Sequence, residues 1–299
     1  MSKRIRIGTR GSELALWQAN FAKNSLEKLG LEVTLVTLKT KGDLIQHLSF
    51  DKIEGKGFFT SELEQALLEN RIDLAVHSMK DLPTESSKGV MIAGVSQRED
   101  PADWLIIDKA KVDGDQVITL AKEAVVGTSS NRRKAQLCFI RPDVILKDIR
   151  GNVPTRVRKI ETGEVDAVIL AAAGLKRIEL DLGHYEVVKL HPREFVPAPA
   201  QGVMAFQCRT DDDKTVEMIR RNLHHPAIAR VTNIERKILR LLQGGCHLPL
   251  GVYCEQDKMG YYHVWSAYAA SLSEPLRHFN LSYTTADGLA EAVVENYLQ

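Results

Sequence analysis

The chain has 299 residues, of which 44% are hydrophobic and 26% charged, as expected for a globular protein of two or three domains. Its 40 Lys and Arg residues almost balance 39 Asp and Glu residues, so neither nucleic acid nor a membrane is an expected partner. The basic start of the chain alternates Ile5 and Ile7 with arginines, which predicts a strand and not a signal peptide. The four cysteines are few and scattered, which favours a reduced, cytoplasmic protein without disulfides.

The first hundred residues alternate between strand and helix patterns. Strand patterns cover 4–7, 33–38 and 74–76. A helix is predicted over 12–29, and a second helix is expected to start at Ser61 with Glu64 completing a capping box. This alternation predicts an α/β fold in which helices cover a mainly parallel sheet.

A short internal repeat follows. Residues 7–10 (IGTR) resemble 126–129 (VGTS), and residues 71–76 (RIDLAV) resemble 164–169 (EVDAVI). The repeat predicts two related α/β lobes with a cleft between them.

Turn-forming residues mark the expected boundaries, at 99–101 and at the Pro- and Gly-containing crossing 196–202. Beyond this crossing, helices are predicted over Lys214–Leu223 and Ala227–Leu242, strands over Val252–Glu255, Tyr261–Ala269 and His278–Ser282, and a last helix over Thr285–Tyr297. This pattern predicts a smaller α+β domain after the two lobes.

Arginines recur where predicted strands turn into helices. Ligands of open α/β sheets bind beyond the carboxyl ends of strands, where helix N-termini and guanidinium groups attract anions. Each arginine taken singly fits a solvated surface charge, but their repeated position after Gly-Thr or Gly-Asn turns favours a ligand with several acidic groups. The set consists of Arg10, Arg132, Arg133, Arg150, Arg156 and Arg177.

Two further segments carry candidate chemistry. Residues 77–83 (HSMKDLP) directly follow a buried strand, so Asp81 is placed to stabilise a cationic intermediate, although it also fits a surface pair with Lys80. His77 is interpreted as a structural histidine. Residues 55–59 (GKGFF) fit either a lid that brings Lys56 and an aromatic ring over the cleft or an ordinary loop.

Cys246 lies in a glycine turn just after a predicted helix. Exposure in such a turn suits a nucleophilic or modified thiol, while a small buried cysteine at a helix end is the plainer alternative. A zinc site built from Cys246, His247 and Cys254 with His224 and His225 is not favoured, because the sequence has no Cys-x-x-Cys pair and no close His pairing at ligand spacing. We therefore predict no metal.

These segments together resemble the porphobilinogen deaminases over nearly the whole chain. The longest matching segment is 75–83 (AVHSMKDLP), and Ala200 stands where the family commonly has glycine. The other matching segments are 7–10, 40–43, 55–59, 127–133, 146–155, 173–177 and 244–246.

The resemblance implies a fold and an activity. The fold would have two lobes like type II periplasmic binding proteins plus a small α+β domain: residues 1–98 with 197–215, residues 99–196, and residues 216–299. The activity would be that of a transferase, hydroxymethylbilane synthase, which condenses four porphobilinogen molecules head to tail with release of ammonia in porphyrin and haem biosynthesis. A monomer is expected, with porphobilinogen as its small-molecule partner.

The resemblance also assigns roles to residues. The primer would be a dipyrromethane cofactor bound to Cys246 through a thioether, and Asp81 would be the catalytic carboxylate. The expected contacts of the cofactor are Lys80, Asp81, Ser129, Ser130, Arg132 and Arg133. The expected contacts of the substrate are Arg10, Ser12, Lys56, Phe59, Arg150, Arg156 and Arg177.

Two other classes of protein share some of these features. A non-catalytic two-lobed protein that binds a polycarboxylate anion would explain the lobes and arginines, but not the exposed Cys246. A cytosolic regulator with such a binding domain is not favoured, because no helix-turn-helix pattern precedes the first strand. A covalent group on Cys246 would separate the enzyme from both.

Overall fold

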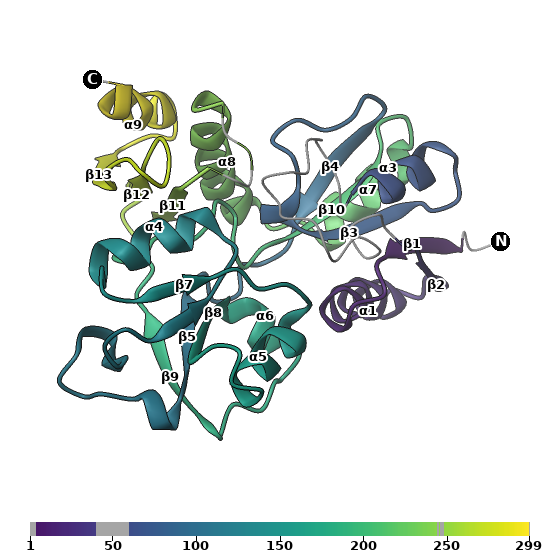
Figure 1. Cartoon of the computed structure of the whole chain (residues 1–299). Helices are drawn as coiled ribbons and strands as arrows, with labels where there is room; N and C mark the ends of the chain where they lie inside the picture. The colour runs from purple at the N-terminus through teal and green to yellow at the C-terminus, as the bar shows by residue number, and fades with distance from the viewer. Residues whose placement is uncertain (1–3, 40–59, 244, 246–247, 299) are drawn as a thin grey trace. The chain divides into compact units, whose positions relative to one another are not determined.

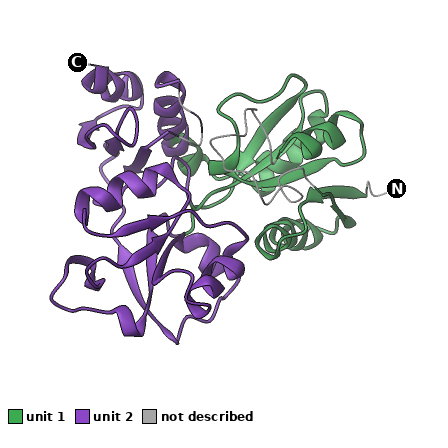
Figure 2. Cartoon of the chain, viewed as in Figure 1, with its two compact units in different colours: residues 1–99, 202–230 green, residues 100–201, 231–299 purple. Residues whose placement is uncertain are grey.

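The computed structural model describes residues 4–39, 60–243, 245 and 248–298. They form two five-stranded mixed sheets and one three-stranded sheet, with helices on the faces of the sheets (Figure 1). The chain divides into two compact units, residues 1–99 with 202–230 and residues 100–201 with 231–299 (Figure 2). The predicted α/β class is confirmed, but each five-stranded sheet has two parallel and two antiparallel pairings instead of the mainly parallel arrangement expected.

The sheet of unit 1 has the strand order β2-β1-β3-β10-β4. Strand β1 pairs in parallel with β2 and β3, whereas β10 runs antiparallel between β3 and β4. Strand β10, which lies between β3 and β4, therefore comes from a segment more than a hundred residues later in the chain. The strands are β1 (Ile5–Thr9), β2 (Val33–Thr37), β3 (Leu74–Ser78), β4 (Val90–Val95) and β10 (Met204–Arg209).

Helices cover both faces of this sheet. Helices α1 (Glu13–Glu27) and α7 (Asp213–Asn222) bury apolar residues against one face, and α3 (Ser61–Leu68) covers the other. Two sequence expectations differ here. The side chain of Glu64 bonds Gln207 and Ser87 instead of closing a capping box, and α3 has no side-chain cap. Helix α7 packs on this unit, although its residues from 216 onward were expected in a C-terminal domain.

The sheet of unit 2 has the order β7-β6-β8-β5-β9. Helix α4 (Asn131–Ile140) contributes Leu137 to the core on one face, while α5 (Val153–Glu161) and α6 (Ala172–Arg177) cover the other. The strands are β5 (Asp103–Asp108), β6 (Val125–Gly127), β7 (Ile145–Lys147), β8 (Ala167–Ala171) and β9 (Tyr185–Leu190).

The two sheets confirm the repeat found in the sequence. In unit 1, β1 pairs in parallel with β2 and β3, and the antiparallel strand β10 lies next to β3. In unit 2, β6 pairs in parallel with β7 and β8, and the antiparallel strand β5 lies next to β8. The aspartates of the repeated segments also make the same contacts. The Asp73 carboxylate accepts from the backbone N of Arg6 at 2.9 Å, and that of Asp166 accepts from the N of Val125 at 2.8 Å.

The rest of unit 2 holds a small antiparallel sheet, β11 (Leu250–Gln256), β12 (Tyr262–Tyr268) and β13 (Arg277–Tyr283). Helices α8 (Pro226–Leu241) and α9 (Leu289–Leu298) share its apolar core. Among the described helices, none is long and apolar enough to cross a membrane. We keep the division into three domains as a proposal, with α7 on unit 1 and not in the C-terminal domain.

Candidate functional site

A cavity of unit 1 lies at the carboxyl ends of β1 and β3. The two strands are parallel neighbours, so the residues that follow them meet at one edge of the sheet. Of the predicted site residues, Arg10, Ser12 and Asp81 line this cavity together. Its volume is about 100 Å³, enough for several waters or one end of a small ligand.

Local structure fixes each of these side chains. Arg10 follows β1 directly, and the Ser12 hydroxyl caps α1 by accepting from the N–H of Ala15 at 3.4 Å. Asp81 ends the short 3-10 helix η2 (Met79–Asp81) and is exposed. Lys80, half-buried, lies next to Asp81 on η2. A charged carboxylate and a guanidinium thus share one small cavity.

Four polar residues that line this cavity were not predicted as site residues, and they are Gln18, Thr60, His77 and Ser78. The Gln18 amide donates to the Ser78 hydroxyl at 2.9 Å, which ties α1 to the end of β3. Burial, opposed by the hydrogen bond with Gln207 and helped by the nearby charge of Arg10, lowers the pKa of His77 to about 4. His77 is therefore a neutral ring near neutral pH. The position of His77 at a strand end, directly before a polar turn, was the signal in the sequence that could have placed it in the cavity, but the residue was interpreted as a structural histidine.

In unit 2, Arg132 and Arg133 form a buried cluster with Asp103, the first residue of β5. Arg132 Nη1 donates to one carboxylate oxygen of Asp103 at 2.7 Å, and Arg133 Nη2 donates to the other at 2.7 Å. Arg133 Nε at 3.2 Å and the Gln201 amide at 3.0 Å also donate to Asp103. The arginines also donate to the carbonyls of Val196 and Ile169, respectively.

Burial and close charges shift the pKa values of Asp103 and Arg132 in this cluster. Burial alone would raise the pKa of Asp103, but the charges and hydrogen bonds of Arg132 and Arg133 hold it well below its usual range. Burial lowers the pKa of Arg132, while the charge of Asp103 opposes that shift. Two guanidinium groups share this carboxylate, so the three side chains carry a net positive charge. Asp103 lies 29 residues before Arg132, and no local pattern in the sequence indicated this partner.

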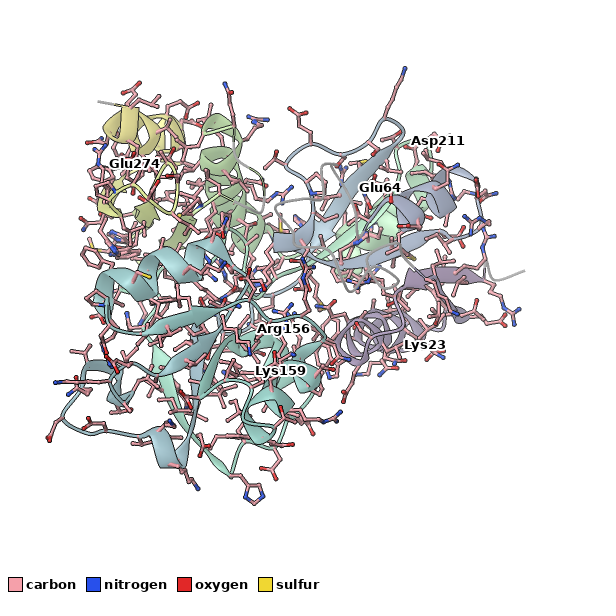
Figure 3. The ribbon with its side chains drawn as sticks, viewed as in Figure 1. Lys23, Glu64, Arg156, Lys159, Asp211 and Glu274 are labelled. Atoms are coloured by element: carbon pink, nitrogen blue, oxygen red, sulfur yellow. The ribbon has the colours of Figure 1, made fainter. Side chains whose placement is uncertain are left out.

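The remaining residues predicted in unit 2 lie on or shortly before helices α4, α5 and α6. The Ser129 hydroxyl donates to the carbonyl of Ile149 at 2.7 Å and accepts from its N–H at 3.0 Å, while Ser130 precedes α4. This pair of bonds joins the start of α4 to the segment that carries Arg150. Arg156 lies on α5 and donates through Nε to the Gly151 carbonyl at 2.8 Å (Figure 3). Arg177, at the end of α6, is buried.

The structure thus places the predicted residues in two sets. Arg10, Ser12, Lys80 and Asp81 belong to unit 1, and the serines and the other arginines belong to unit 2. Lys56, Phe59 and Cys246 lie outside the described residues. The assignment of each side chain to cofactor or substrate stays a prediction.

Comparisons with known proteins agree with the motif arrangement. The family model described as "Porphobilinogen deaminase, dipyromethane cofactor binding domain" matches residues 5–217. A curated porphobilinogen deaminase of Moorella thermoacetica is 47% identical over 248 residues, which cover 82% of this chain and 77% of that protein. The chain belongs to the porphobilinogen deaminase family. As an enzyme of this family it is a transferase of tetrapyrrole synthesis, and the cofactor of the family's matched domain is dipyrromethane.

Solved structures show more distant likenesses. A periplasmic substrate-binding protein of an ABC transporter from Coxiella burnetii is 13% identical, with a TM-score of 0.46, over 75% of this chain and 94% of that one. The periplasmic aliphatic sulphonate binding protein of Escherichia coli is 14% identical, with a TM-score of 0.43, over 81% of this chain and 71% of that one.

Proposed function

We propose that this chain is a hydroxymethylbilane synthase that joins four porphobilinogen molecules head to tail and releases one ammonia for each. The growing tetrapyrrole would be built on a dipyrromethane primer held by Cys246 through a thioether. The observation that carries the proposal is that Asp81 and Arg10 line one cavity in a chain of the porphobilinogen deaminase family.

The residues present fit the cofactor and the substrate. Both are pyrroles with acidic side chains, so they require cationic groups for their carboxylates and an acceptor for the pyrrole N–H. The cavity of unit 1 has Arg10 for the first and Asp81 for the second. In unit 2, the excess positive charge of Arg132 and Arg133 over Asp103 suits one more carboxylate. When bound, the dipyrromethane would supply an electron-rich pyrrole carbon as the nucleophile.

Asp81 would act on the substrate. As ammonia leaves the aminomethyl group of porphobilinogen, positive charge develops on the remaining pyrrole. A carboxylate at the edge of the cavity stabilises that charge and accepts a hydrogen bond from the ring N–H. Asp81 is carried by η2, which directly follows β3, and this connection places its carboxylate at the cavity.

The arginines would bind the carboxylates of the substrate and the cofactor and so orient both molecules. Arg10, Arg150, Arg156 and Arg177 are proposed for the carboxylates of incoming substrate, with Ser12, Lys56 and Phe59. Lys80, Arg132, Arg133, Ser129 and Ser130 are proposed for the cofactor. Guanidinium groups suit this task because they bind a carboxylate through two parallel hydrogen bonds.

The intact mass of freshly purified protein, with peptide mapping around Cys246, tests the proposal directly. The expected result is added mass equal to two deaminated porphobilinogen units on the Cys246 peptide, and formation of hydroxymethylbilane from porphobilinogen. A Cys254→Ser variant is the matched control, because Cys254 is buried in β11 and should leave the adduct in place. Protein that gains no adduct even after incubation with porphobilinogen would support the non-catalytic binding protein instead.

A further inference from the structure

A fully buried carboxylate joins the small antiparallel sheet to the segment where the chain leaves unit 2. Glu235 on α8 has no exposed surface. Its Oε2 accepts from the backbone N–H of Ala200 at 2.6 Å, and its Oε1 accepts from the N–H of Cys254 on β11 at 2.8 Å. A buried carboxyl group is costly unless its oxygens are hydrogen-bonded, and both oxygens of Glu235 are. Glu235 therefore fixes Ala200 relative to α8 and β11.

Residues 196–201, called the connecting segment below, also contact β11 near their start. The N–H of Val252 donates to the Pro197 carbonyl at 2.9 Å. A Cβ at Gly251 would overlap the carbonyl oxygen of Val196, so glycine is what allows β11 to approach the segment this closely. The small sheet therefore holds the start of the connecting segment as well as its end.

Ala200 has a backbone conformation that depends on such contacts. Its φ is 62°, in the left-handed region that costs free energy for any residue with a Cβ. Residues in such conformations persist where the surrounding structure over-determines them. The bond to Glu235 is one such constraint, so its removal should let Ala200 relax toward an unstrained conformation.

The same segment contacts the arginine cluster of unit 2. Gln201 has no exposed surface, and its amide donates to Asp103 at 3.0 Å. Asp103 in turn binds Arg132 and Arg133, and Arg132 also donates to the carbonyl of the segment's first residue at 2.9 Å. A displaced Ala200 would move its neighbour Gln201, and with it the carboxylate that the two guanidinium groups share.

We propose that Glu235 is a positioning residue for the cofactor, which acts through the connecting segment on Arg132 and Arg133. This inference rests on the proposed function, in which these two arginines bind a carboxylate of the dipyrromethane. A bidentate bond to a carboxylate requires the planar guanidinium in one orientation. Two guanidinium groups that share one buried anion take their orientation from it, so a shift of Asp103 is passed to both.

NMR of the arginine side chains tests the positioning without any turnover. Arg133 donates through Nε to Asp103 at 3.2 Å, so its Nε–H signal reports on the cluster, and Arg133→Lys identifies that signal by removing it. Glu235→Gln keeps the size of the side chain but turns an amide N–H toward a backbone N–H. In this variant the Arg133 signal is expected to shift and to exchange with water about tenfold faster.

Cofactor loading then connects the positioning to function. The rate at which adduct-free protein gains the adduct from porphobilinogen, followed by intact mass, is expected to fall about tenfold in Glu235→Gln. Adding Ala200→Gly should restore most of this rate, because glycine adopts a positive φ without strain. A residue that only stabilises the core would not be rescued in this way. Glu291→Gln is the matched control, because Glu291 on α9 pairs with Lys237 on α8, and it should change neither the Arg133 signal nor loading.

An unchanged Arg133 signal or an unchanged loading rate in Glu235→Gln would overturn the inference, and so would a loss that Ala200→Gly does not reduce. If the Glu235 variants do not fold, hydrogen exchange of the wild-type protein decides. The Ala200 amide should then exchange as slowly as the amides of the core strands, and fast exchange counts against the inference. A wild-type protein that gains no adduct from porphobilinogen would defeat the proposed function, and that result is separate from the NMR result.

Discussion

The cavity of unit 1 and the arginine cluster of unit 2 hold charge in opposite ways. Asp81 is exposed at the end of a short turn, whereas Asp103 has no exposed surface and binds both Arg132 and Arg133. Both sites follow the same strand arrangement, since the two sheets share one order. The same fold can therefore present a carboxylate to a ligand or use one to hold cations inside the protein.

This difference separates function from stability. Removing an exposed carboxylate changes the chemistry at the cavity and little else, because water solvates what remains. Removing a buried partner leaves charges that neither water nor protein compensates. The predictions below test the contrast, beginning with the largest effect.

Replacing Asp81 should abolish catalysis while the protein stays folded. Asp81→Ala is expected to lower kcat by about 10²–10⁴-fold, because the cation that develops on the substrate loses its carboxylate. Asp81→Glu should retain part of the activity, since the charge remains one methylene away. The rate of product formation checks this, with thermal unfolding as the control for folding. Normal turnover in Asp81→Ala would remove the residue from the mechanism.

Replacing Asp103 should have the opposite outcome. Asp103→Asn leaves two buried guanidinium groups without an anionic partner, and the free energy of unfolding is expected to fall by about 3–5 kcal/mol. Urea denaturation measures this. The matched control is Glu255→Gln, which removes a carboxylate from the more exposed pair with Arg193 and should cost less than about 1 kcal/mol. Equal losses in the two variants would contradict the contrast.

A pH titration sharpens the comparison further, through His77. Its pKa falls from 6.5 to about 4 on folding, so between these values the unfolded chain binds a proton that the folded protein does not. Stability is therefore lost as pH falls through this window and is fully present above it. The wild-type protein should lose about 3 kcal/mol more than His77→Phe between pH 7 and pH 4. Parallel stability curves for the two proteins would show that His77 is not held neutral.

The sequence predicted the elements well and their distant contacts poorly. The periodic patterns of α1 and α8 and the repeated 71–76 and 164–169 segments gave helices, strands and the two lobes, because these depend on neighbours along the chain. The capping box at Glu64 failed because a tertiary contact with Gln207 replaced the local one. Asp103, the partner of Arg132 and Arg133, could not be predicted for the same reason, because it is distant from them in the chain.

The same distinction between local patterns and distant contacts applies to the candidate site. The motif at 77–83 predicted Asp81 next to a strand end, and the structure places it in a cavity with Arg10. His77 contacts Gln207, 130 positions away in the chain, and Gln207 in turn donates to Glu64, 13 positions before His77, so no pattern near His77 contained these contacts. Buried hydrogen-bond networks are set by packing, and packing is what a single sequence leaves out.

The smallest effect is expected at Ser129, which was predicted to contact the cofactor. Its hydroxyl already donates to the carbonyl of Ile149 and accepts from its N–H, so Ser129→Ala leaves both backbone groups without a partner. The expected loss of stability is about 1–3 kcal/mol. Ser130→Ala is the control, because its hydroxyl does not cap α4. If Ser129→Ala also lowers turnover, KM should rise while kcat stays the same, because the affected segment carries Arg150, which is proposed to bind a carboxylate of the substrate. A stable Ser129→Ala protein that fails to load its cofactor would instead assign the hydroxyl to direct binding.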